Sequence, residues 1–204
     1  MATIDAKLVN QLRMETGAGM MDCKRALEEA VGNQDKAREI LKKKGLEKAE
    51  NIAGKSGEKG GPKEGRIGMY VHTTGKVAAL VELSCETDFV AKNEEYQDLL
   101  KELAVAVAAF NPVAISKEDL PKDLVEEEKR KFEADIKGKP PEIALKIVEG
   151  KLEKNLYAQK CLLHMPFPKE DKFKGTYGDF LKSKVVKLKE NLVVRRFVRM
   201  EVGK

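Results

Sequence analysis

The fold is decided by the stretch KVAALVELSCETDFVAKN, residues 76–93, in which a predicted strand gives way to a predicted helix. From Val77 to Leu83, apolar residues recur at a period of two, which is typical of a half-buried strand. Asn93 then offers a helix-capping side chain, and apolar residues follow at helical spacing until Pro112 ends the run. The sequence therefore predicts a strand-to-helix junction just before Asn93.

Asp88 and Phe89 fall at this junction and allow two interpretations. Phe89 can staple the helix entry to the protein's own core, as apolar residues beside N-caps often do. Alternatively, the junction presents both side chains to a partner. Residue chemistry alone favours the staple.

The surrounding segments predict an α+β fold. Two strands, residues 66–71 and 76–85, alternate around Thr73-Thr74-Gly75, which indicates an antiparallel hairpin. A helix at residues 177–188 and a strand at residues 192–202 follow near the C-terminus. We expect the last strand to complete a three-stranded antiparallel sheet packed with helices.

A long helical hairpin is predicted between the sheet segments. Its first helix follows Pro121, its second runs from about residue 142 to residue 163, and residues 138–141, Gly-Lys-Pro-Pro, join them. Its apolar seam is expected on the second helix, at Ala144, Leu145, Val148, Leu152, Leu156 and Leu163.

The N-terminal region predicts three short helices, at residues 4–14, 20–31 and 34 to about 49. Residues 51–65 are rich in Gly, Pro and charge and predict a flexible linker. The expected division is therefore a three-helix domain at 1–50, this linker, and a core domain at 66–204. The expected three-helix core comprises Leu8, Val9, Leu12, Met21, Leu27, Val31, Ala37, Ile40 and Leu41.

Composition narrows the classes of function. The 39 Lys and Arg exceed the 34 Asp and Glu by five, but both signs are interspersed, and aromatic residues are only 5% of the chain with no Trp. Direct nucleic-acid binding is therefore not expected. With no apolar run of membrane-spanning length and no signal-peptide pattern at the N-terminus, we expect a cytoplasmic protein.

Enzymatic and metal motifs are weak. Gly54-Lys55-Ser56 follows a helical pattern rather than a strand, which argues against a phosphate-binding loop. His72 and His164 stand apart from any cluster at metal-ligand spacing, so we expect neither a metal nor a cofactor. The three cysteines, an odd number at irregular spacing, are expected to be reduced core residues: Cys23, Cys85 and Cys161.

Two motifs carry a family resemblance. Thr87-Asp88-Phe89-Val90-Ala91-Lys92-Asn93, followed by a long apolar helix, resembles the signature of bacterial and organellar elongation factor Ts. The segment LRMETGAGMMDCKRAL, residues 12–27, is similar to the N-terminal motif of the same family. Both stand in the family's order and at its expected distance.

This resemblance implies a guanine-nucleotide exchange factor for elongation factor Tu, acting on the GDP-bound and nucleotide-free GTPase without covalent chemistry. The N-terminal domain would be similar to a ubiquitin-associated domain and would dock on the nucleotide-binding domain through Leu12, Arg13, Met20 and Met21. Core packing is the alternative role for Met20 and Met21.

The resemblance also implies how the core domain acts. Asp88 and Phe89 would push between two helices beside the nucleotide pocket and disturb the magnesium site. Thr87 would shape the turn, and Val90 would extend the apolar contact.

A single copy of the strand-to-helix signature is present, whereas longer family members carry two related core subdomains. Because compact members pair, we expect a homodimer. Two other functions stay open: an adaptor whose N-terminal domain binds ubiquitin-like or peptide ligands, and a basic RNA-associated protein suggested by the net charge of +5.

Overall fold

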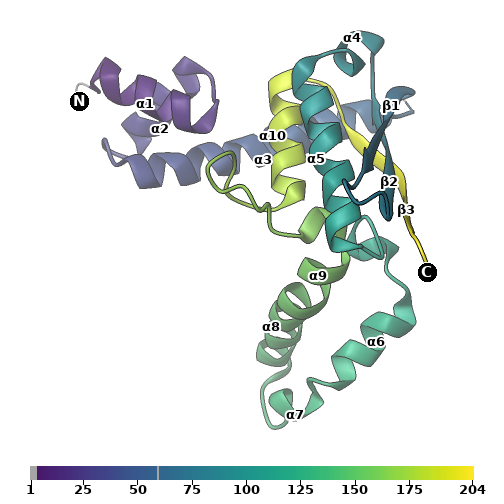
Figure 1. Ribbon diagram of the computed structural model, residues 1–204. Helices are drawn as coiled ribbons and strands as arrows, with labels where there is room; N and C mark the ends of the chain where they lie inside the picture. Colours follow the sequence, from purple (N-terminus) through teal and green to yellow (C-terminus); the bar gives the residue numbers. More distant parts are fainter. Residues whose placement is uncertain (1–3, 59) are drawn as a thin grey trace.

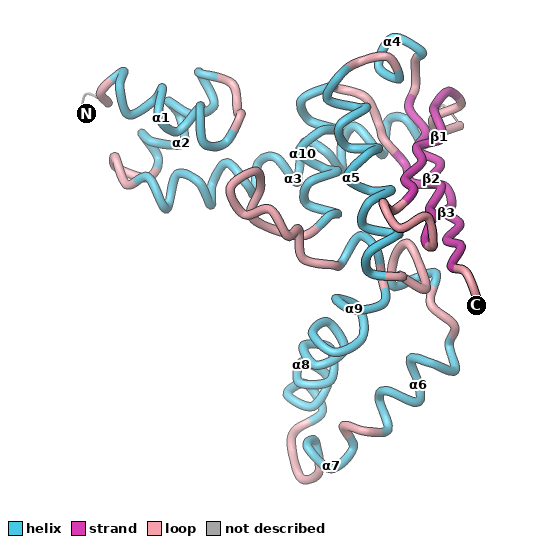
Figure 2. The backbone as a smooth tube through the Cα atoms, in the orientation of Figure 1, coloured by secondary structure: helices cyan, strands magenta, loops and turns pink. Residues whose placement is uncertain are grey.

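The computed structural model describes residues 4–58 and 60–204, and it has an α+β architecture (Figure 1). Strands β1 (Glu64–Val71), β2 (Val77–Cys85) and β3 (Val193–Glu201) form an antiparallel sheet in the order β1-β2-β3. This confirms the predicted three-stranded sheet. In Figure 2 the strands gather at one edge of the molecule, and helices make up most of the remainder.

One face of the sheet is covered by helix α5 (Glu94–Phe110), which packs on β1 and β2, and α10 (Tyr177–Leu188) packs on α5 in turn. Gly68 on β1 makes the close approach possible, because a Cβ there would lie 2.5 Å from Cγ of Leu100. We call the sheet, α4 (Asp88–Ala91), α5, α10 and the segment 162–176 before α10 the sheet unit. The largest fully buried side chains of its core are Tyr96, Tyr177, Leu83, Leu99, Leu103, Leu162, Val81 and Val107.

The opposite face of the sheet is apolar and exposed. Met69 on β1 pairs with Leu80 on β2, which pairs with Val198 on β3, so the three side chains form a row across the sheet. At one edge of this face the side chains of Arg196 and Glu82 form an ion pair of 2.6 Å. The exposed face consists of Ile67, Met69, Val71, Leu80, Val198, Met200 and Val202.

The N-terminal module, residues 4–41, is formed by α1 (Ala6–Thr16), α2 (Met20–Glu29) and the first part of α3 (Gln34–Glu58). Met21 and Val31 were expected in its core, but both are exposed. Cys23 and Ala26 fill the α2 face instead, so the helix is rotated relative to the expected phase. The buried residues of the module are Val9, Leu12, Cys23, Ala26, Leu27, Ala30, Ala37 and Leu41.

Helix α3 does not stop near residue 49, so the expected linker at 51–65 is wrong over residues 51–58. Ala49, Ile52 and Ser56 lie at spacings of three and four, and Ala49 and Ile52 pack with the sheet unit's core. This packing, with contacts between α3 and α10, keeps a glycine-containing segment helical. The linker's Lys59 lies outside the described residues. The module is thus joined to the sheet unit by a continuous helix (Figure 1).

The predicted hairpin is present, with more breaks than expected. Its first arm is α6 (Lys122–Arg130) followed by the short α7 (Glu133–Ile136). Its second arm is α8 (Pro141–Leu152), a π-helical turn (Glu153–Tyr157) and α9 (Ala158–Lys160). Leu152 and Leu156 lie in the apolar seam, whereas Leu145 is 71% exposed and outside it.

Two short 3-10 turns lie at the base of the hairpin, at Lys117–Asp119 and Leu162–His164. Ala114 forms a parallel bridge with Cys161, which brings the incoming and outgoing chains together. The hairpin therefore projects from the sheet unit (Figure 1).

Candidate functional site

The junction, residues 85–93, presents the strand-to-helix signature on a single turn of helix. Strand β2 ends at Cys85, and α4 spans Asp88–Ala91. Thr87 caps α4, its side-chain oxygen accepting from the Val90 amide at 3.4 Å. The Cys85 thiol donates to the Thr87 carbonyl oxygen at 3.1 Å. Short-range hydrogen bonds therefore help to fix this turn.

Phe89 is 82% exposed at the tip of this turn, so the staple interpretation is wrong. Ala91 is buried and Val90 packs against the core, which seats α4 on its other side. An aromatic side chain that stays in solvent while smaller neighbours are buried gains little in the free protein. It is instead available to enter an apolar pocket of a partner.

Asp88 lies beside Phe89 and is also exposed. Lys92 Nζ donates to Asp88 Oδ2 at 2.8 Å, and this hydrogen bond lowers the pKa of the carboxyl below its usual range. Asp88 is therefore ionised at neutral pH, with a cation one helical turn away. Since the pair is exposed, exchanging Lys92 for another partner costs little.

The N-terminal candidates fall into two groups. Arg13, Met20 and Met21 are exposed on either side of the α1–α2 turn, so core packing is wrong as the role of the two methionines. Leu12 is fully buried and supports the surface from beneath. Met14, at 88% exposure, adds an apolar side chain that the sequence analysis did not single out, although it lies inside the N-terminal motif.

These two sets of residues lie on separate parts of the molecule. Figure 1 shows the N-terminal module apart from the sheet unit and joined to it by α3, while α4 caps one end of the sheet. The ion pair between Lys42 on α3 and Asp179 on α10, at 3.0 Å, is one contact near the connection. The two sets of exposed residues therefore lie on separate parts of the molecule that a continuous helix joins.

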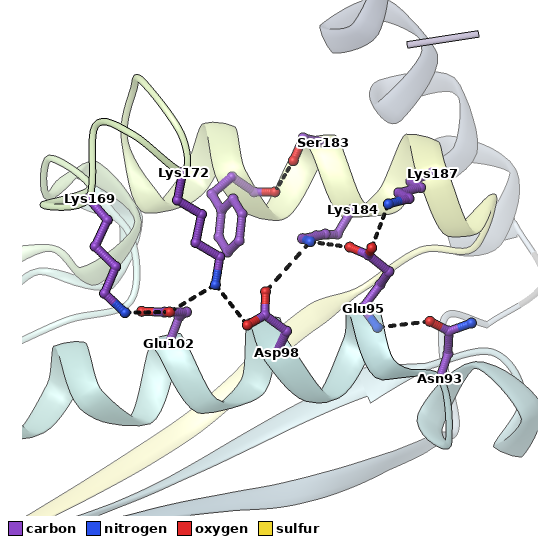
Figure 3. A network of polar contacts seen from close by, with 10 residues as sticks. Asn93, Glu95, Asp98, Glu102, Lys169, Lys172, Ser183, Lys184 and Lys187 are labelled. Carbon is purple, nitrogen blue, oxygen red and sulfur yellow. Dashed lines mark hydrogen bonds and ion pairs between the residues drawn. The ribbon is translucent and has the colours of Figure 1, made fainter. Parts of the chain in front are cut away.

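A charged network fixes α5, the helix that follows the junction (Figure 3). Its acids face lysines of α10 and of the loop before α10. Hydrogen bonds from Lys184 and then Lys187 lower the pKa of Glu95 to about 2. The paired residues are Glu95, Asp98 and Glu102 on one side and Lys169, Lys172, Lys184 and Lys187 on the other.

Within residues 4–58 and 60–204, no group of three or more His, Cys, Asp or Glu is placed to hold a metal ion. The same residues form no helix of the length and apolarity that crossing a membrane requires. Cys23, Cys85 and Cys161 are buried free thiols, and burial raises the pKa of each, to about 11 for Cys161. All three are small core residues, as predicted.

Comparison with known proteins shows a family for this chain. The family model described as elongation factor TS matches residues 6–204. Elongation factor Ts of Thermodesulfovibrio yellowstonii is 48% identical over 201 residues, covering 98% of this chain and 96% of the relative. Elongation factor Ts of Coprothermobacter proteolyticus is 46% identical over 202 residues, 98% of each chain.

These matches place the chain among translation elongation factors. It belongs to the elongation factor Ts family, which the two sequence motifs had indicated.

Proposed function

We propose that this chain is a cytoplasmic guanine-nucleotide exchange factor for elongation factor Tu, which binds the GDP-bound GTPase and promotes GDP release so that GTP can bind. Family membership supports this role in translation elongation. The observation that carries it is Phe89, held 82% exposed on a four-residue helix beside an ionised Asp88. The chain acts by conformational coupling and forms no covalent bond with its partner.

The junction is the part that acts on the nucleotide site. Phe89 enters between two helices of the GTPase, and Asp88 rearranges hydrogen bonds or opposes charge near the magnesium ion. Magnesium demands near-ideal octahedral geometry and bridges phosphate oxygens to protein ligands. A small displacement of its surroundings therefore weakens nucleotide binding. Thr87 fixes the turn, and Val90 extends the apolar contact next to Phe89.

The N-terminal module supplies a second contact, on the GTPase's nucleotide-binding domain. Arg13, Met20 and Met21 are exposed and available for it. Methionine side chains adapt to irregular apolar surfaces, which suits a contact that must persist while the partner changes shape. Leu12 holds this surface in place from the core.

Binding of the two ligands is reciprocally linked. If the factor lowers the GTPase's affinity for GDP, GDP lowers its affinity for the factor by the same ratio. A typical coupling of ~1–3 kcal/mol changes affinity by roughly 5- to 150-fold. GTP binding then releases the factor by the same linkage.

The test is release of a fluorescent GDP analogue from elongation factor Tu, with and without this chain. We expect strong acceleration by the native chain and a loss of about 30-fold with Phe89→Ala, the effect of losing a hot-spot side chain worth ~2 kcal/mol. Asp88→Ala should reduce the acceleration as well. Phe110→Ala, a half-exposed phenylalanine at the other end of α5, is the matched control.

No acceleration by the native chain would contradict the proposal. Equal acceleration by the Phe89→Ala variant would remove the junction as the acting part.

The chain is also proposed to form a homodimer through the exposed face of the sheet. This face is a contiguous apolar surface centred on Met69, Leu80 and Val198, and water-exposed patches of this kind mark interaction sites. A second copy is the proposed occupant, because the chain has a single core where longer relatives of the family have two. Two identical faces related by a two-fold axis bury each other's apolar row.

Light scattering tests the dimer. The native chain should give twice the monomer mass, and Leu80→Lys should give the monomer, because a charge would be buried at the centre of the interface. Leu145→Lys adds the same charge on the exposed side of α8 and should leave the dimer intact. A monomer mass for the native chain, alone and in complex with the GTPase, would remove the proposal.

A further inference from the structure

Glu190, in the turn between α10 and β3, makes three hydrogen bonds to the junction, about which the family signature says nothing. Its Oε2 accepts from the amides of Glu86 at 3.0 Å and Thr87 at 3.1 Å. Its Oε1 accepts from the Thr87 hydroxyl at 2.6 Å. In return, the amide of Asn191 donates to Glu86 Oε1 at 3.2 Å. One carboxylate therefore satisfies two consecutive backbone amides and the capping hydroxyl.

The Glu190 carboxylate binds the backbone just beyond the end of the sheet. The last pair between β2 and β3 is Ser84 with Val193, and the ladder of paired residues ends there. Lys189 ends α10 in the left-handed conformation, with φ of 60°. This places Glu190 beside the residues that follow β2. Glu86 and Thr87, which have lost their ladder partner, are held by a side chain instead.

The other restraints on the junction are the hydrogen bond from the Cys85 thiol to the Thr87 carbonyl oxygen, the packing of Val90 and the burial of Ala91. The amides of Glu86 and Thr87 are held by Glu190. Helix α4 is a single turn, and a helix that short is unstable without tertiary support. The Phe89 side chain is largely in solvent, so packing does not fix it. The Thr87 hydroxyl donates to Glu190 while accepting from Val90, so the carboxylate also orients the cap of α4.

We propose that Glu190 is a positioning residue for nucleotide exchange, which holds Thr87 so that Asp88 and Phe89 approach the GTPase in one fixed direction. This proposal rests on the proposed exchange function. Glu190 acts through the junction and does not itself touch nucleotide or magnesium. Preorganisation of this kind reduces the entropy lost when the junction enters the partner. It should raise the rate of exchange more than the strength of docking, because the N-terminal module docks separately.

The isosteric change Glu190→Gln tests the chemistry directly. A glutamine has one carbonyl oxygen and an NH₂ group, which is a donor and cannot accept from an amide N–H. Its carbonyl oxygen can still accept from the two amides, but its NH₂ group must then donate to the Thr87 hydroxyl, which accepts instead of donating, and all three hydrogen bonds lose the charge of the carboxylate. We expect the maximal rate of GDP release to fall about tenfold at saturating concentration. The concentration giving half-maximal rate should change by less than about twofold. Glu190→Ala removes all three hydrogen bonds and should cause the larger loss of maximal rate.

Three further measurements separate positioning from general stability. Glu94→Gln removes one negative charge at the start of α5 and should leave both kinetic values unchanged. In an Asp88→Ala/Phe89→Ala background, Glu190→Gln should cause no additional loss, because the residue acts only through these two side chains. Amide hydrogen exchange of the free chain should show faster exchange at Glu86 and Thr87 in Glu190→Gln, with the amides of α5 unchanged.

The possible failures are distinguishable. If the native chain does not accelerate GDP release, the proposed function fails, while amide exchange still reports whether Glu190 orders the junction. If the native chain is active and Glu190→Ala matches it, positioning by Glu190 is wrong. A loss that adds to that of the Asp88→Ala/Phe89→Ala variant, or that is accompanied by faster exchange throughout α5, would equally overturn the proposal by showing a general structural role.

Discussion

The N-terminal module and the sheet unit differ in how they are stabilised. The described residues of the module's core include no aromatic side chain and several alanines. The sheet unit buries Tyr96, Tyr177, Phe167 and Phe180, and its charged network joins α5 to α10. A small core stabilises its domain only marginally. The difference suits the two proposed tasks, in which the module makes an adaptable contact with the GTPase and the sheet unit supports the junction.

Truncating a buried side chain in the module's core should lower the free energy of unfolding the most. Leu27 is fully buried there, and Leu27→Ala should cost about 2–5 kcal/mol, as buried leucines do when truncated. We expect the module to unfold by itself while the sheet unit stays folded. Circular dichroism on heating should show an early loss of helix before the main transition.

Leu145→Ala, on an exposed leucine of α8, is the control, with an expected change within about 0.5 kcal/mol. A single transition of the Leu27→Ala variant, shifted as a whole, would show that the two parts unfold as one unit.

The second prediction tests the connection between the two parts. Gly45 lies in α3 between Leu41, which packs in the module, and Ala49, which packs on the sheet unit. Proline in a helix interior costs about 3 kcal/mol, because it removes a hydrogen bond and clashes with the preceding turn. Gly45→Pro should leave both cores folded but allow the distance between the module and the sheet unit to vary. The concentration needed for half-maximal GDP release should rise, since linked contacts lose effective concentration.

An unchanged half-maximal concentration for Gly45→Pro would mean that the two contacts act independently. Small-angle scattering of the free chain would show whether the separation had changed.

Local patterns predicted most of the sheet unit. Helix α10 has the bounds that the sequence indicated, and Asn93 caps α5 as expected, because capping residues and apolar spacing are local signals. The continuation of α3 was missed, since Gly54 and Gly57 read as helix breakers and only contact with the sheet unit overrides them.

The candidate site was predicted in part. The junction was located by its motif. Residue chemistry alone did not predict the exposure of Phe89, because a staple and a partner contact share one sequence pattern, whereas the family resemblance implied it. Glu190 was missed as well. It meets Glu86 across 104 positions of sequence, and no periodicity or spacing reports a contact at that distance.

The third prediction concerns the pH dependence of the charged network between α5 and α10 in the sheet unit. Hydrogen bonds from Lys184 and Lys187 lower the pKa of Glu95 from its usual 4.5 to about 2. A carboxyl whose pKa is lower in the folded state adds stability above pH 4.5, and this stability is lost as the pH falls toward 2. After allowance for solvent screening, about 1–2 kcal/mol should be involved.

The free energy of unfolding, measured in urea at about pH 5.5 and pH 3, should therefore fall more for the native chain than for Lys184→Met, which keeps the length of the side chain. An equal fall for the two proteins would show that the network does not stabilise α5.

The fourth prediction concerns the contact that the N-terminal module is proposed to make with the GTPase. Met21→Ser removes an exposed apolar side chain from the module's proposed contact and should weaken binding by about 1 kcal/mol, roughly fivefold. The maximal rate of GDP release should stay the same, unlike in Phe89→Ala. Val31→Thr, at the opposite turn of the module and 80% exposed, is the matched control. A lower maximal rate for Met21→Ser would contradict the proposal that the module contributes to binding and the junction to the rate of release.

A stabilising substitution in α3 should have the weakest effect of the five. Gly45 is helical, and a Cβ at this position would meet no atom within 4 Å. Gly45→Ala should therefore stabilise α3 by about 0.5–1 kcal/mol, since alanine loses less backbone entropy in a helix. If the fixed separation of the two parts matters, this variant should lower the half-maximal concentration slightly while Gly45→Pro raises it. Opposite signs from one position would identify helix continuity, rather than any side-chain contact, as the property that couples the module to the sheet unit.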